Sequence, residues 1–226
     1  MNTDKPDSDS SGYRYDDPSP YGPSLIREAL AEYAGDTEND GGYTLDDYYA
    51  LPDERRVELI DGVFYDMAAP TSIHQYLITE IWRILSNYVR SKKGTCITLV
   101  SPLDVQLDCD DRTMVQPDIV VICDNKKLTE KVVFGAPDFT LEVFSPSTKK
   151  KDMFLKLTKY KEAGVREYWM VDPDKKQVIV YRFEDDDLMS LYSFNDRVPV
   201  GIFGGDCCVD FAEICGYAGF LGISGL

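Results

Sequence analysis

The sequence predicts an α/β fold of the α+β kind, in which a mixed β-sheet is flanked by helices. Two long segments repeat apolar residues at helical spacing, and several short runs rich in β-branched and aromatic residues are typical of strands. The order along the chain is hairpin, helix, strands, helix, strands. This order indicates one sheet with helices packed against it.

Each expected element has a local signal. Thr44 is a helix N-cap residue before a short helix, and Asp61-Gly62 is a strong hairpin-turn signal. A second helix, residues 149–163, ends before Gly164. In residues 74–91, one helical stripe is formed by Leu77, Ile78, Ile81, Leu85 and Tyr88. Strands are expected within residues 57–68, 95–108, 116–123, 138–145, 167–173, 176–183 and 189–194.

The chain divides into three parts by composition. Residues 1–42 form an acidic arm, rich in Pro, Ser, Asp and Gly, that we expect to be largely disordered apart from a short helix at 25–34. Residues 43–200 form the folded domain. Residues 201–226 are an apolar, Gly-rich extension that we expect to pack on the domain or on a partner, for instance in a homodimer.

Charge, cysteine usage and hydropathy narrow the class of protein. The net charge is −16 and the pI is near 4.4, whereas nucleic-acid binders are usually basic. The charge is uneven, because residues 1–54 carry a net −11 and residues 126–182 a net +5. The six cysteines contain no Cys-x-x-Cys pair, which favours reduced thiols in a cytoplasmic protein. We expect no secretion signal, no membrane span and no membrane partner.

Three carboxylates stand in apolar sequence. Asp118 and Glu142 begin or interrupt strand-like runs, and Glu58 precedes the hairpin turn. An ionised carboxylate near a core is costly unless it is paired or bound to a metal. Magnesium sites typically use about two carboxylates together with water and phosphate. The alternative is that each acid caps a turn, pairs with a basic residue or faces solvent.

Three stretches of the chain resemble a known family. They are "VELIDGVFYDMAAPTSIHQYLITEI", "VQPDIVVI" and "DFTLEVFSPSTKKKDMFLKLTKYKEAGVREYWMVDPDKKQVIVYR". They resemble the Uma family of bacterial endonucleases, which belongs to the PD-(D/E)XK superfamily, and the resemblance covers about residues 43–195. It implies a restriction-endonuclease-like fold and metal-dependent hydrolysis of phosphodiester bonds, with Mg²⁺ or Mn²⁺ as cofactor.

The resemblance also implies which residues form the site. Glu58 matches the acid before the hairpin, Asp118 matches the "PD" acid, and Glu142 matches the acid of the (D/E)XK motif. All three would be metal ligands and catalytic residues. A second Pro-Asp pair, at Pro137-Asp138, has no place in the pattern.

The lysine of the motif is missing, because Phe144 occupies its position. Where this lysine has migrated in related families, a helix supplies it, and the resemblance favours Lys156, with Lys159 second. Read from the residues alone, Asp152, Lys156 and Tyr160 share one face of the second helix. That face could equally point to solvent with one modest ion pair.

His74 and Gln116 are weaker candidates. His74, the sole histidine, lies at the start of the long helix, where a cap or packing role competes with a supporting catalytic role that the resemblance implies. Gln116 precedes the Pro-Asp pair and could contact phosphate.

The sequence therefore predicts a metal-dependent endonuclease whose partner is nucleic acid, expected to be DNA. Two alternatives stay open. One is a catalytically inactive binding or assembly module on the same fold, and the other is a protein-interaction module that shows no salt-dependent affinity for DNA.

Overall fold

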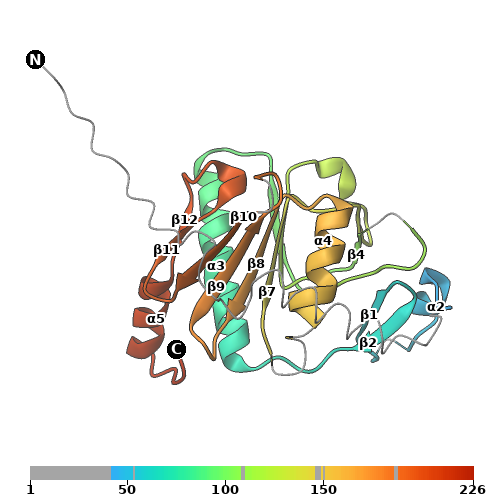
Figure 1. Ribbon diagram of the computed structural model, residues 1–226, viewed down its shortest axis with the longest axis horizontal. Helices are drawn as coiled ribbons and strands as arrows, with labels where there is room; N and C mark the ends of the chain where they lie inside the picture. The colour runs from blue at the N-terminus through green and yellow to red at the C-terminus, as the bar shows by residue number, and fades with distance from the viewer. Residues whose placement is uncertain (1–41, 53, 108–109, 146–148, 150, 186–187) are drawn as a thin grey trace, which may run out of the picture.

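A six-stranded mixed sheet forms the centre of the protein in a computed structural model, which describes residues 42–226 except 53, 108–109, 146–148, 150 and 186–187 (Figure 1). The strand order is β10-β9-β8-β7-β5-β3. The strands are β3 (Ile97–Val100), β5 (Ile119–Ile122), β7 (Phe139–Val143), β8 (Glu167–Asp172), β9 (Gln177–Arg182) and β10 (Leu188–Ser193). β7 and β8 run parallel and the other neighbours antiparallel, which confirms the predicted mixed sheet.

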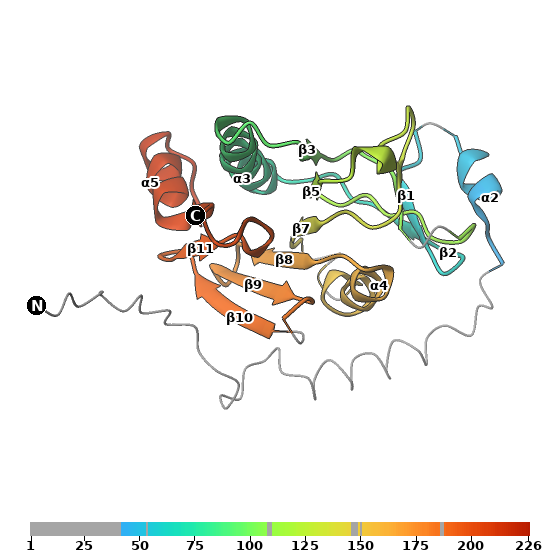
Figure 2. The ribbon, with the colours of Figure 1, turned by 90° about the horizontal axis from the view of Figure 1, so that it is seen from above.

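Helices cover both faces of this sheet (Figure 2). On one face lies α3 (Ser72–Ser91), and four residues of its predicted stripe are buried: Leu77, Ile78, Ile81 and Leu85. The other face is covered by the π-helix η2 (Lys151–Lys156) and the helix α4 (Leu157–Ala163). α4 ends at Gly164, whose φ of 91° is the left-handed cap that glycine favours.

A hairpin of β1 (Val57–Ile60) and β2 (Val63–Asp66) stands beside the main sheet. Its turn has positive φ at Asp61 (51°) and Gly62 (77°), as an Asp-Gly hairpin requires. The hairpin is joined to the segment before β5 because Leu59 pairs with Met114. The remaining elements nearby are α2 (Leu45–Tyr49), β4 (Val105–Gln106), η1 (Asn125–Lys127) and β6 (Val133–Phe134).

The C-terminal segment packs beside α3. It contains β11 (Arg197–Pro199), η3 (Gly201–Phe203), β12 (Cys208–Asp210) and α5 (Phe211–Phe220). Phe211 and Ile214 are buried in the same cluster as the α3 stripe, and Tyr76 Oη donates to the Ile214 carbonyl at 2.9 Å. The predicted helix at 25–34 lies outside the described residues.

Two cysteines form a disulfide, so the expectation of reduced thiols is wrong for this pair. Cys96 and Cys123 flank the paired residues Ile97 and Ile122 of β3 and β5, with Cα atoms 4.0 Å apart. Strand pairing brings them together across 27 positions of sequence, and spacing motifs do not reveal such a pair. Among the residues described, no helix is both long and apolar enough to cross a membrane.

Candidate active site

Strand register places two of the predicted acids opposite each other. Ile119 of β5 pairs with Leu141 of β7, so Asp118 and Glu142 lie one position further along the two antiparallel strands. Directly opposite residues project to the same face of a sheet. Both side chains line one cavity of about 170 Å³, which the described residues of β1, α3 and η2 also line.

One oxygen of Asp118 is held by two donors. Its Oδ2 accepts a hydrogen bond from the Val143 backbone N–H at 2.8 Å and lies 3.2 Å from His74 Nε2. Burial favours neutral His74, but the hydrogen bond to Asp118 and the charge of Asp118 outweigh it and raise the pKa of His74 above its usual value. The N-cap Thr71 Oγ1 accepts from the His74 N–H and fixes the first turn that carries this imidazole. The His74 imidazole therefore helps to hold the Asp118 carboxylate in position.

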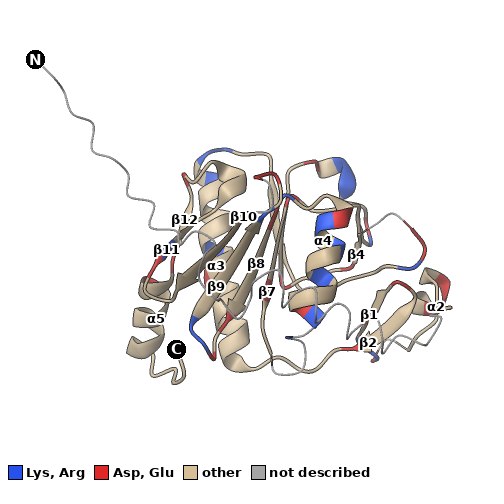
Figure 3. Cartoon of the chain, in the orientation of Figure 1, with Lys and Arg blue, Asp and Glu red and all other residues tan. Residues whose placement is uncertain are grey.

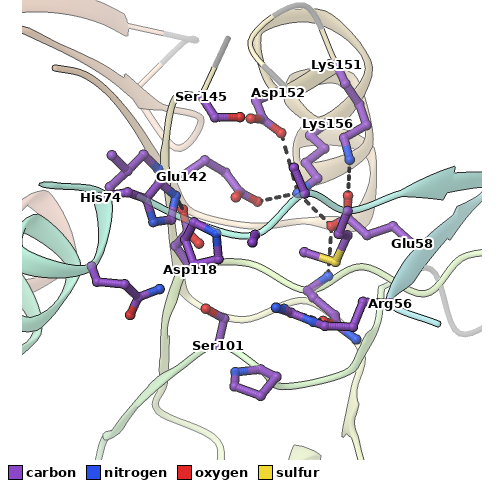
Figure 4. A pocket seen from close by; sticks show the side chains of 18 residues that line it. Arg56, Glu58, His74, Ser101, Asp118, Glu142, Ser145, Lys151, Asp152 and Lys156 are labelled. Atoms are coloured by element: carbon purple, nitrogen blue, oxygen red, sulfur yellow. Dashed lines mark hydrogen bonds and ion pairs between the residues drawn. The ribbon is translucent and has the colours of Figure 1, made fainter. Parts of the chain in front are cut away.

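One oxygen of Glu142 is held in the same way. Its Oε1 accepts hydrogen bonds from Lys156 Nζ and from Tyr160 Oη, each at 2.7 Å. Burial raises the pKa of Glu142 well above its usual value, and the carboxylates of Asp152, Asp118 and Glu58 add to this against the opposing charge of Lys156. Figure 4 shows Lys156 at the centre of these contacts.

Glu58 is fully buried and paired. Its Oε1 accepts from Lys156 Nζ at 2.7 Å and from the Gln116 backbone N–H at 2.9 Å, and its Oε2 accepts from Lys151 Nζ. Burial alone would raise the pKa of Glu58, but the charges of Lys156 and Lys151 lower it to about 2. Both oxygens are occupied, so the contacts favour a role in holding lysines, and the predicted role of Glu58 as a metal ligand stays a prediction.

The π-helix explains how two lysines reach one carboxylate. Lys151 and Lys156 are five residues apart, which in an α-helix corresponds to about 140° around the axis. The i→i+5 bonding of a π-helix brings residues five apart onto nearly the same face. η2 spans these two residues, and both ammonium groups contact Glu58. From the sequence, the lysine run at 149–151 is expected to be a solvated helix start or a contact to a nucleic-acid backbone, and the solvated alternative is wrong for Lys151, whose side chain is buried.

Two other positions named from the sequence, Lys159 and Phe144, are not among the residues that line the cavity. Lys159 Nζ pairs with Asp61 at the hairpin turn, at 2.5 Å. Phe144 is buried in the cluster under α4. The solvent-facing alternative for the helix is wrong, since Asp152, Lys156 and Tyr160 are at most 2% exposed.

The second Pro-Asp pair lies elsewhere. Asp138 precedes β7, at the end of that strand opposite to Glu142. Its Oδ2 accepts from the Cys123 N–H at 2.7 Å, and its Oδ1 accepts from Arg166 Nη1 at 3.2 Å. Both contacts are structural and connect neighbouring segments at that end of the sheet.

The donor set fits a small magnesium site with two protein carboxylates. In the part of the chain that the structure describes, no partner occupies Asp118 Oδ1 or Glu142 Oε2, whereas the second oxygen of each is held. The same part contains no group of three or more His, Cys, Asp or Glu residues arranged to hold a metal. A hard cation would therefore take two carboxylate oxygens and complete its shell with water or phosphate.

Comparisons with known proteins agree with this fold. A family model described as "Uma2: Putative restriction endonuclease" matches residues 45–201. A Synechocystis sp. protein, "Uncharacterized protein slr1290", is 26% identical over 158 residues, which are 68% of this chain and 80% of that protein. A crystal structure described as "a putative nuclease belonging to DUF820 from Anabaena variabilis ATCC 29413" has a TM-score of 0.65 at 21% identity, covering 77% of this chain and 98% of that one. The family model covers more than half of the chain, and the chain therefore belongs to the Uma2 family.

Proposed function

We propose that this protein is a metal-dependent endonuclease that hydrolyses phosphodiester bonds of nucleic acid, with DNA as the substrate and Mg²⁺ or Mn²⁺ as the cofactor. One observation carries the proposal. Asp118 and Glu142 lie opposite each other at the edge of a cavity, each with one oxygen held and one without a described partner. Membership of a family described as restriction endonucleases supports the same activity.

Asp118 Oδ1 and Glu142 Oε2 are the atoms that would hold the ion. A bound divalent cation lowers the pKa of water and offsets negative charge that develops on a phosphoryl group. His74 and the Val143 N–H keep Asp118 in place, while Tyr160 and Lys156 keep Glu142 in place. Such supporting contacts orient metal ligands and raise metal affinity.

Lys156 supplies a fixed positive charge. Burial disfavours its charged form, but the carboxylates of Glu142, Glu58 and Asp152 raise the pKa of Lys156 well above its usual value. The ammonium therefore stays protonated and donates hydrogen bonds, rather than accepting a proton from water. A preorganised cation beside the scissile phosphate stabilises the charge of the transition state.

A non-catalytic binding module on the same fold is the second candidate. Glu58 is satisfied by two lysines and a backbone N–H without any metal, so part of the charged cluster is self-sufficient as a structural network. This candidate predicts nucleic-acid or protein binding with no divalent-cation requirement.

Cleavage of supercoiled plasmid and of single-stranded DNA with Mg²⁺ or Mn²⁺ tests the proposal. The wild type is compared with the double variant Asp118→Asn, Glu142→Gln, and with Asp138→Asn as the matched control from the second Pro-Asp pair. We expect metal-dependent cutting that the double variant loses and the control keeps. Cutting that persists in the double variant, or a wild type that neither cuts nor binds metal, would overturn it.

A further inference from the structure

One cation of the cavity has no described carboxylate partner. The cationic side chains that line it are Arg56, Lys151 and Lys156, together with His74. Lys151 and Lys156 pair with Glu58, Glu142 and Asp152, and His74 pairs with Asp118. Within the described ranges, the Arg56 side chain makes one hydrogen bond, from Nη2 to Gln116 Oε1 at 3.3 Å. Arg56 is exposed, so solvent screens its charge in the free protein and its guanidinium is open to a ligand of opposite charge.

Gln116, the residue that contacts Arg56, is itself fixed by hydrogen bonds. Gln116 is 9% exposed, and its Nε2 donates to Asp104 Oδ1 at 2.8 Å and to Tyr48 Oη at 3.1 Å. With both amide hydrogens used in this way, the amide oxygen of Gln116 faces Arg56. The guanidinium carries five N–H donors, so most remain for a ligand in the cavity.

Just before β1, Arg56 and its neighbour Arg55 make different contacts. Arg56 is two residues before Glu58 and lines the cavity with it, while Arg55 pairs with Asp66 at 3.2 Å and lies over the Phe64 ring. Figure 4 shows Arg56 on the side of the cavity near Ser101, across from Asp152. The two arginines have the same charge and adjacent positions, but of the two only Arg56 lines the cavity.

We propose that Arg56 binds a backbone phosphate of the nucleic-acid strand at this cavity, and that Gln116 is its positioning residue. This proposal rests on the proposed nuclease activity. A planar guanidinium matches the two non-bridging oxygens of a phosphodiester, which a lysine ammonium does not. The other cations of the cavity already contact its own acids, so among the described residues Arg56 is the cation available for a first contact with the polyanion. Phosphate contacts of this kind position a strand and read no sequence.

The test measures the binding of fluorescein-labelled single-stranded and duplex oligonucleotides by fluorescence anisotropy. Binding is measured over a range of KCl concentrations, with Ca²⁺ in place of Mg²⁺. The variants are Arg56→Gln, Arg56→Lys and the matched control Arg55→Gln. We expect Arg56→Gln to weaken binding about tenfold and to reduce the slope of log K against log[salt] by about 0.7 for single strands or 0.9 for duplex. Arg56→Lys should keep the slope and lose part of the affinity, and Arg55→Gln should match the wild type.

The outcomes separate the two proposals. Cleavage by the wild type with identical binding by Arg56→Gln and Arg55→Gln overturns the role of Arg56 and leaves the nuclease intact. Binding that depends on Arg56 without cleavage supports the phosphate contact and argues against the nuclease. A wild type that binds no oligonucleotide overturns the phosphate contact. Thermal unfolding of each variant excludes loss of folding, and the salt slope is a readout that a merely structural arginine would not change.

Discussion

Glu58 is a buried carboxylate whose charge depends on two lysines. Removing one partner of a buried ion pair leaves the other charge uncompensated, at a cost of about 3–5 kcal/mol. We expect Glu58→Gln to lower the free energy of unfolding by this amount near pH 7. Because Lys156 and Lys151 lower the pKa of Glu58 to about 2 from an ordinary value of 4.5, its contribution is present above pH 4.5 and is lost as the pH falls toward 2.

Urea denaturation of the wild type and Glu58→Gln between neutral and acidic pH measures this difference. The exposed Glu130→Gln is the control, and its unfolding free energy should follow the wild type at every pH. A difference for Glu58→Gln that is small at pH 7, or that grows with acid, would contradict the ion-pair account.

Tyr160 orients Glu142 by a single hydrogen bond. Its hydroxyl donates to Glu142 Oε1, and it is completely buried, so Tyr160→Phe removes the bond with little change of shape. We expect Mn²⁺ affinity to fall about tenfold, because contacts that orient a metal ligand typically matter by that factor or more. Tyr168→Phe is the matched control, since the Tyr168 hydroxyl donates to the Asp152 carbonyl instead. Calorimetric titration with Mn²⁺ that finds equal losses in both variants would refute the role of Tyr160.

At the scale of the elements, local signals predicted most of the architecture. The turn at Asp61-Gly62 was predictable because only residues that tolerate positive φ fit there, and the α3 stripe because apolar spacing follows the helix period. The π-helix was not predictable in this way. Its consequence, the convergence of Lys151 and Lys156 on Glu58, depends on partners some 90 positions away in sequence.

The disulfide joins two elements that local pattern does not connect. Cys96 and Cys123 fasten the edge strand β3 to β5, close to the strand end opposite Asp118. Cross-linking over 27 positions stabilises a protein by about 3–4 kcal/mol through the unfolded chain. We expect the double variant Cys96→Ser, Cys123→Ser to lose this amount in urea denaturation under oxidising conditions. Cys208→Ser, at a free thiol, is the control, and a wild type with equal midpoints with and without reductant would contradict the effect.

At the scale of the molecule, charge is compensated locally rather than gathered on one face. Figure 3 shows Lys and Arg interspersed with Asp and Glu over α4 and its surroundings. Part of the net +5 of residues 126–182 is compensated by acids that the described lysines contact: Lys149 pairs with Asp172, Lys156 with Glu142, and Lys159 with Asp61. Arg56 has no acidic partner among the described residues, and the proposed phosphate contact rests on this difference.

The candidate site was predictable as a set of residues but not as a set of contacts. Glu58, Asp118, Glu142, Lys156 and His74 all line one cavity, and their roles in metal binding and catalysis stay predictions. Which carboxylate is open to a metal ion and which pairs with lysines depends on the oxygen that each donor contacts. These contacts follow from three-dimensional packing, which spacing in the sequence does not reveal.

Homodimerisation through the C-terminal segment stays a prediction. Tyr217 and Phe220 on α5, and Leu221 just beyond it, are exposed.

The central claim is that Asp118 and Glu142 hold the divalent cation while Glu58 holds lysines. The most direct test is an anomalous difference map from a crystal of the wild-type protein soaked in Mn²⁺. The account predicts one strong peak within about 2.0–2.3 Å of Asp118 Oδ1 and Glu142 Oε2, with Glu58 still bound to Lys151 and Lys156. A peak coordinated by Glu58, or an occupied Mn²⁺ site elsewhere with none at this pair, would contradict it.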